Sequence, residues 1–207
     1  MNTVTHVLVN AAIDRRVREQ RDGGNATGEH PIATKAFLWG GAAPDLPLIA
    51  MTAGAMAWFP LRHGWSLGRS FQHIFRNLYF ENPAWIAANN LLQSPTMLLL
   101  MLAGLLLLRR RRPAAAHSML WFLLGAVVHV ALDIPVHHDD GPLLFFPFQS
   151  TIRFQSPVSY WDPRHYGDIV RIVELVLMVA LVLYLLRPRL RRWFGRTNAG
   201  SEAGDRH

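Results

Sequence analysis

The chain has 207 residues, of which 51% are hydrophobic and 17% charged. Soluble domains are charged at about a quarter of their positions, so this composition argues against an ordinary soluble domain. Cysteine is absent, which excludes disulfides and thiolate metal sites. The formal net charge is +7, and a basic excess indicates either nucleic acid or a membrane, depending on where the charges lie.

The beginning of the chain is apolar from Thr3 to Ile13 but too short to cross a bilayer. It predicts a short half-helix that either packs in a bundle or lies at the membrane interface. Residues 15–30 are polar and contain several glycines, a composition typical of a loop. Met1 to Asn10 lacks the basic start and cleavage site of a secretory signal peptide, so we expect none.

Four later stretches are apolar enough to form spanning helices, each of which takes about 20 mostly apolar residues. We predict them at 33–59, 86–108, 117–136 and 169–186. The expected fold is therefore all-α, a polytopic membrane helical bundle of about four transmembrane helices plus the N-terminal half-helix. Residues 1–186 would form one membrane-embedded helical domain, and residues 187–207 a basic, partly disordered cytoplasmic tail.

The basic residues gather in three groups. Four arginines precede the first predicted span, four more follow the second at Arg109–Arg112, and six lie after the fourth, out of 21 Lys and Arg in all. With four spans all three groups fall on one side, which the positive-inside rule assigns to the cytoplasm. We expect an integral protein of the bacterial inner (plasma) membrane with a cytoplasmic C-terminus, in contact with lipids and not with nucleic acid.

Ionisable residues inside spans are costly and usually functional. His129 and Asp133 are four residues apart in the third predicted span, so both side chains share one helical face. Such a pair can bind one divalent ion, or one group can orient the other. The alternative is a polar pair that only holds helices together.

Other polar residues lie in or near the spans. Asp45 stands between Pro44 and Pro47 at a predicted helix break, where it either faces a polar site or caps the kinked helix. Glu174 lies in the fourth span at a depth similar to that of Asp133, as a ligand, a base or an ion-pair partner of Arg171.

The loop after the third span begins His137-His138-Asp139-Asp140. These are suitable ligand types for a second metal or for a substrate. The alternative, which is favoured for the two aspartates, is a solvated interfacial loop.

A family resemblance rests on several short motifs spread over most of the chain. The motifs are Thr5-His6, Gly41–Asp45 (Gly-Ala-Ala-Pro-Asp), His129-x-x-x-Asp133, and the segments Gly141–Leu143 and Phe146-Pro147. With these motifs the chain resembles the LexA-regulated, membrane-bound metal-dependent hydrolase-like family, and it is distantly similar to zinc-dependent phospholipase C. The family's Thr-His-Ser after the first span is replaced here by a stretch, 89–94, without histidine.

The resemblance implies that His6, Asp45, His129 and Asp133 bind a divalent metal, with zinc expected and manganese as the alternative. The expected function is a metal-dependent hydrolase acting on a phosphoester or lipid-like substrate near the outer interface. Its general base would be Asp140 or Glu174, and His137 or His138 would stabilise developing charge. A metal-binding or ion-handling protein without turnover, and a structural membrane protein, remain as alternatives.

Overall fold

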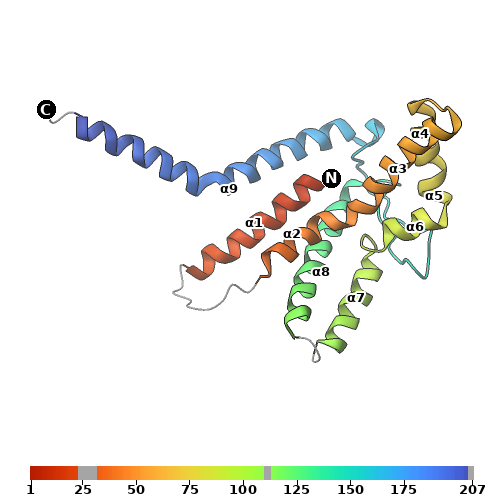
Figure 1. Ribbon diagram of the computed structural model, residues 1–207, viewed down its shortest axis with the longest axis horizontal. Coiled ribbons are helices and arrows are strands. Elements are labelled where there is room, and N and C mark those ends of the chain that lie inside the picture. The colour runs from red at the N-terminus through yellow and green to blue at the C-terminus, as the bar shows by residue number, and fades with distance from the viewer. Residues whose placement is uncertain (23–31, 110–112, 205–207) are drawn as a thin grey trace.

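The computed structural model describes residues 1–22, 32–109 and 113–204, and beyond Pro188 only the course of the helix. Part of the predicted polar loop (23–30) and the arginines at 110–112 lie outside the described residues. Within the described ranges every element is helical, and a single isolated bridge joins Leu143 to Arg153. The all-helical prediction is confirmed (Figure 1).

The described helical elements range from three residues to 38. In chain order they are α1 (Thr3–Asp22), α2 (Thr34–Ala42), the 3-10 turn η1 (Ala43–Asp45), α3 (Leu46–His63), α4 (Leu67–His73), the π-helical turn η2 (Ile74–Leu78), α5 (Tyr79–Glu81), α6 (Pro83–Asn90), α7 (Pro95–Leu108), α8 (Pro113–Asp133), η3 (Ile134–Val136), η4 (Pro163–His165) and α9 (Gly167–Gly204).

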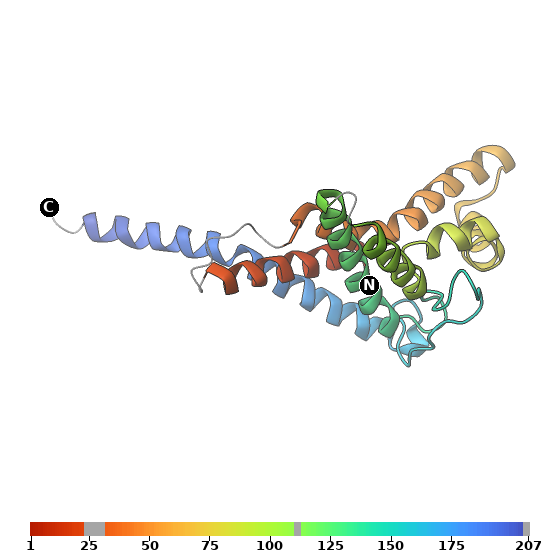
Figure 2. The same ribbon diagram turned by 90° about the horizontal axis from the view of Figure 1, so that it is seen from below.

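Helix α1 is longer than the predicted half-helix. It has 20 residues and continues into the polar segment that was expected to be a loop, as far as Asp22. Arg15 pairs with Glu19 and Arg18 with Asp14, each four residues apart, and pairs at this spacing support a helix. Of the two expected locations, the helix takes the packed one, because it contacts α2, α8 and α9 (Figures 1 and 2).

Prolines break two of the predicted spans. The first is divided into α2, η1 and α3, since Pro44 and Pro47 donate no backbone N–H to a continuous helix. The second is divided into α6 and α7, which meet at an angle of 56°. At this break the Ser94 side chain accepts a hydrogen bond from the Met97 N–H, and Pro95 occupies the first turn of α7.

These breaks correct the prediction of four spans. Two described helices are long and apolar enough to cross a membrane, Pro113–Val136 and Gly167–Pro188, and a third span results if α6 and α7 are counted together. The composition of the first predicted segment is apolar, but its backbone is interrupted too early to form one straight helix. Helix α9 instead extends past the predicted end of the fourth span to Gly204, and the partial disorder of the tail stays a prediction.

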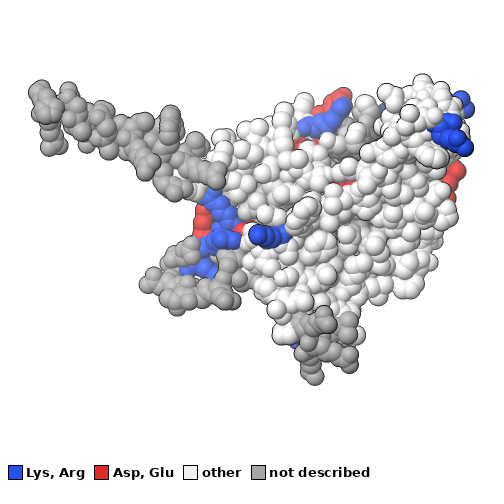
Figure 3. Space-filling model, in the orientation of Figure 1, with Lys and Arg blue, Asp and Glu red and all other residues white. Residues whose placement is uncertain are grey.

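The distribution of polar and apolar side chains is consistent with a membrane protein. The described interior buries polar and charged side chains, among them His6, Asn10 and His129, alongside its few core hydrophobics. Large apolar side chains instead face outward, and only 6% of the apolar window of α9 is buried. Most of the surface in Figure 3 carries neither acidic nor basic side chains. Such a surface suits an apolar environment. Helices are stable there because each backbone N–H and C=O is hydrogen-bonded within the helix.

Helix α8 is the centre of the bundle and packs most closely against α2. A Cβ atom added to Gly40 would lie 2.0 Å from the Phe122 carbonyl oxygen, and one added to Gly125 would lie 2.3 Å from that of Phe37. Only glycine permits this approach, as is common where membrane helices cross. The contact brings the Gly41 carbonyl to the face of α8 that carries His129.

Candidate metal centre

The site lies where three elements meet at the C-terminal end of α8. Helix α1 contributes His6, the turn η1 contributes Asp45, and α8 contributes His129 and Asp133. The structure therefore brings together all four residues that the resemblance implied. His6 and His129 are fully buried and Asp133 is 4% exposed.

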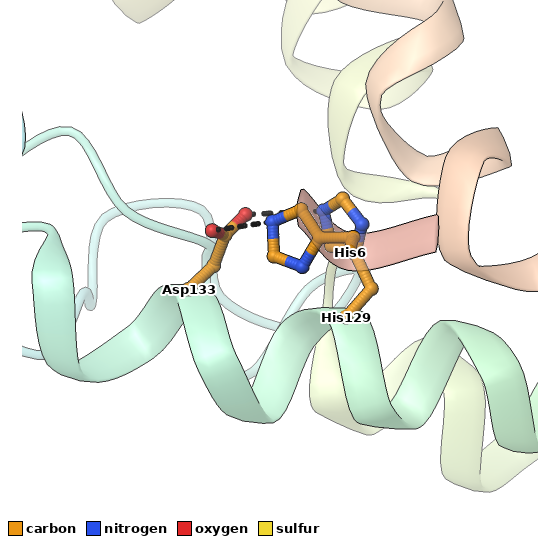
Figure 4. A group of neighbouring side chains, drawn as sticks. All are labelled: His6, His129 and Asp133. Atoms are coloured by element: carbon orange, nitrogen blue, oxygen red, sulfur yellow. Dashed lines mark hydrogen bonds and ion pairs between the residues drawn. The ribbon is translucent and has the colours of Figure 1, made fainter. Parts of the chain in front are cut away.

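Both imidazoles point their Nε2 atoms at the carboxylate of Asp133 (Figure 4). The distances are 3.0 Å from His6 Nε2 to Oδ1 and 3.0 Å from His129 Nε2 to Oδ2. The two rings stack with centroids 3.7 Å apart. One ligand atom from each of the three residues lies within 4.8 Å of the other two, so together they can hold one metal ion.

The tautomer of His129 suits a metal ligand. Its Nδ1 lies 2.9 Å from the Gly41 carbonyl oxygen, which can only accept, so Nδ1 carries the proton. In the neutral ring the lone pair is then on Nε2, where a metal ion would bind. That atom is buried and lacks hydrogen-bond geometry although it lies within ion-pair distance of Asp133. A histidine ligand fixed through its other nitrogen by a backbone carbonyl is the usual arrangement at metal sites.

His6 also has an unsatisfied nitrogen, since its Nδ1 is buried without a hydrogen-bond partner. Burial lowers the pKa of His6 below its ordinary value, which favours the neutral ring that metals bind. Two buried imidazoles whose Nε2 atoms both lie 3.0 Å from one buried carboxylate therefore fit a divalent ion.

Asp45 approaches the group at His129. Its Oδ1 lies 3.4 Å from His129 Nε2, but it does not belong to the three-residue set whose ligand atoms are mutually close. Thr3 Oγ1 donates to Asp45 Oδ2 at 2.6 Å, and Gln93 Nε2 donates to Asp45 Oδ1 at 3.3 Å. These two contacts fix the direction of the carboxylate.

Two further groups approach Oδ1 of Asp133, one as a hydrogen-bond donor and one at ion-pair distance. The amino group of Met1 lies 2.8 Å away, and His137 Nε2 lies 3.7 Å away. His137 is held in turn by Asp140, whose Oδ1 is 3.0 Å from Nδ1. Burial disfavours protonation of His137, but the carboxylates of Asp133 and Asp140 outweigh it and raise its pKa to about 9.

The other two predicted catalytic residues lie elsewhere. His138 turns into the loop, where Nδ1 contacts the Ser156 carbonyl oxygen at 2.6 Å and the ring stacks on His165. Glu174 is buried and accepts from the Asn2 N–H at 2.7 Å. Its proposed partner Arg171 pairs with Asp168 instead. Neither His138 nor Glu174 lines the cavity described next.

A cavity of about 620 Å³ opens onto Asp45 and Asp133. His137 and Asp140 also line it, whereas His6 and His129 do not. Tyr79 closes one side by donating from its hydroxyl to the Asp140 carbonyl oxygen at 2.7 Å. Burial raises the pKa of Tyr79 to about 12, so the hydroxyl stays a donor.

Three supporting groups were not predicted from the sequence, namely Thr3, Gln93 and the Gly41 carbonyl. Thr3 had a local signal, because it precedes His6 by three residues and so lies on the same face of α1. Gly41 stands in the Gly41–Asp45 motif and Gln93 in the stretch 89–94, but neither was given a role, because they reach the site only through the α2–α8 contact and the α6–α7 break.

The arrangement as a whole offers two imidazoles and a carboxylate, a supporting aspartate, and an accessible cavity lined by a second His–Asp pair. No protein-family model matches the chain, and neither a curated protein nor a solved structure matches it.

Proposed function

We propose that this protein is a membrane-embedded, metal-dependent hydrolase of the type that its motifs resemble. Its metal would be held by His6, His129 and Asp133, with Asp45 as the fourth group of the centre. Zinc is the expected ion, with manganese as the alternative, because two imidazoles and carboxylates suit both. The substrate would be a phosphoester or a lipid-like ester that reaches the centre through the cavity.

One observation carries the proposal: two buried histidines converge on one carboxylate that itself faces a cavity. Catalytic zinc sites commonly have three protein ligands and keep a position open for water. The Met1 amino group neutralises part of the charge of Asp133, and a divalent ion would neutralise Asp133 and Asp45 together. A purely structural role needs no cavity, and the open side of Asp133 therefore favours chemistry.

The chain's own residues have distinct proposed roles. A bound divalent ion would lower the pKa of a water molecule and so supply hydroxide at neutral pH. Asp45 and the Gly41 carbonyl would orient His129, and Thr3 and Gln93 would orient Asp45. His137, held by Asp140, faces the cavity beside Asp133 and is positioned to hold or deliver a proton at Nε2.

The proposed location is the bacterial inner membrane with the C-terminus in the cytoplasm. Support comes from the two apolar helices, from the exposed apolar surface and from the clustered arginines. The partners would then be membrane lipids.

The first test is metal content. Protein purified without chelator and offered zinc or manganese should hold about one divalent ion per chain. His129→Ala and Asp133→Ala should each lose most of it, while His165→Ala, in the loop between α8 and α9, should retain it. Elemental analysis of the purified variants gives the answer. Metal-free wild-type protein would favour a centre that only joins helices.

Turnover separates a hydrolase from a metal-binding protein. The loaded wild-type protein should release nitrophenolate from a panel of nitrophenyl phosphate mono- and diesters and carboxylic esters. Asp140→Asn should keep the metal and lose roughly 100-fold or more in rate, since general acid–base groups contribute at about that level. Asp168→Asn, at an exposed position in the first turn of α9, is the matched control. A loaded protein inactive on the whole panel would be a metal-binding protein without hydrolysis.

A further inference from the structure

The cavity above the centre is divided into a polar and an apolar part. Its polar residues are connected, because Gln93 contacts Asp45, and His137 lies beside Asp133. Its apolar residues come from other turns and other helices. They are Leu48 and Ile49 of α3, and Phe71, Phe75 and Phe80 of the α4–α5 segment.

The apolar part forms a continuous wall. The rings of Phe71 and Phe75 lie 4.6 Å apart, Phe75 lies 6.3 Å from Tyr79, and Tyr79 lies 4.9 Å from Phe80. Ile49 and Phe71 are each 51% exposed and Phe80 is 42% exposed. A wall that is apolar, half exposed and beside a polar floor leaves hydrophobic area that a ligand would cover.

The charges of the cavity limit what its polar end can bind. Among the described residues that line it, the carboxylates of Asp45, Asp133, Asp139 and Asp140 outnumber the Met1 amino group and the His137 ring. This acidic excess would attract a cationic head group, whereas binding of an anionic head group would be strengthened by the metal. The volume of about 620 Å³ lies within the common range of small-molecule sites, which is about 300 to 1,000 Å³.

We propose that the substrate is an amphiphile that binds with its polar head at Asp133 and His137 and its hydrocarbon chain along Ile49, Phe71 and Phe75. The identity of the head rests on the proposed function, because the metal determines which charge is accepted. The position of the ligand's hydrocarbon chain does not rest on the proposed function, because it depends only on the apolar wall. The α3–α5 segment is thereby assigned as the chain-binding part of the site.

The proposal is tested by chain-length dependence, measured by titration calorimetry on protein in lipid nanodiscs, with empty nanodiscs as the blank. Methyl and hexyl phosphate are titrated into zinc-loaded protein, and methylammonium and hexylammonium into metal-free protein. Each buried methylene strengthens binding by up to roughly fourfold. The hexyl compound should therefore bind at least about tenfold more tightly than the methyl compound in both series.

Two variants locate the effect. Ile49→Asn and Phe71→Ser should each reduce the hexyl-to-methyl ratio by about threefold or more, while leaving the methyl compounds unchanged. Leu61→Asn, on the same helix as Ile49 but 86% exposed and outside the cavity, should leave the ratio as in the wild type. Equal binding of hexyl and methyl compounds in both series overturns the proposal. A reduction of the hexyl-to-methyl ratio in Leu61→Asn as large as in Ile49→Asn and Phe71→Ser also overturns it.

The two head groups distinguish the failures. If the ammonium series depends on chain length but zinc-loaded protein does not bind hexyl phosphate, the chain-binding wall stands and the metal-dependent function fails. If zinc is bound and phosphates bind without regard to chain length, the metal centre stands and the amphiphile proposal fails.

Discussion

Asp133 is the residue on which the candidate centre depends, since its two oxygens face different histidines. Oδ1 is approached by His6 Nε2 and Oδ2 by His129 Nε2. One carboxylate therefore connects α1 to α8 through side chains. The same carboxylate reaches the cavity, so that its structural and chemical roles coincide at one residue.

Asp45 is expected to have a smaller effect than Asp133. It approaches His129 at 3.4 Å and lies outside the three mutually close ligands. Asp45→Ala should weaken zinc affinity about 10- to 100-fold, the cost typical of losing a group that supports a ligand. Competition with a chelator of known affinity measures the change. A loss as complete as that of Asp133→Ala would make Asp45 a full ligand.

At the level of the elements, the close contact of α2 and α8 determines where His129 points. Gly40 and Gly125 let the two backbones meet, and the Gly41 carbonyl then accepts from His129 Nδ1. Asn10 of α1 strengthens the same junction by donating from Nδ2 to the Phe37 and Gly125 carbonyl oxygens. Helix packing and the tautomer of a candidate ligand are thus coupled.

Gly125→Ala should therefore destabilise the protein and impair the centre. The added Cβ would lie 2.3 Å from a backbone oxygen, and overpacking of this kind costs about 1–3 kcal/mol. Thermal unfolding in detergent should show a lower midpoint, and elemental analysis a lower zinc content. Gly54→Ala is the control, because its Cβ meets nothing within 4 Å and alanine favours the helix. Unchanged stability in Gly125→Ala would contradict the close packing.

At the scale of the whole molecule, the loop 137–166 and the α4–α5 segment lie at the same end. Tyr79 donates to Asp140, and the Arg153 guanidinium lies 5.5 Å from the Tyr79 and Phe80 ring centroids. The arginine groups at 15–21 and 109–112 lie at other points of the sequence, each separated from that end by apolar helices. Both segments around the cavity should therefore face the same side of the membrane.

Reporter fusions test this topology. Fusions after Arg112 and after Arg196 should read cytoplasmic, because the arginine clusters favour that side. Fusions at Gly64 and at Gly141 should both read external, since the segments that follow them line one cavity. Opposite signals from Gly64 and Gly141 would contradict the shared side, and a cytoplasmic signal at both would reverse the assigned orientation.

The sequence by itself determined the features that depend on local periodicity and composition. Apolar stretches gave the all-helical class, and the spacing of His129 and Asp133 placed both on one face of α8 because a helix repeats every 3.6 residues. The prolines around Asp45 predicted the break at η1. The break at Ser94-Pro95 had the same local cause but was passed over within a strongly apolar stretch, so the number of straight spans was overestimated.

Only the tertiary structure decided which distant residues meet. His6 joins the centre because α1 packs as a full helix against α8, and Gln93 reaches Asp45 because α6 and α7 bend by 56°. His138 turns away to the Ser156 carbonyl while its neighbour His137 faces Asp133, although both are the same residue type in the same loop. Such outcomes depend on close approach between elements, as at Gly125, and no local pattern in the chain encodes that distance.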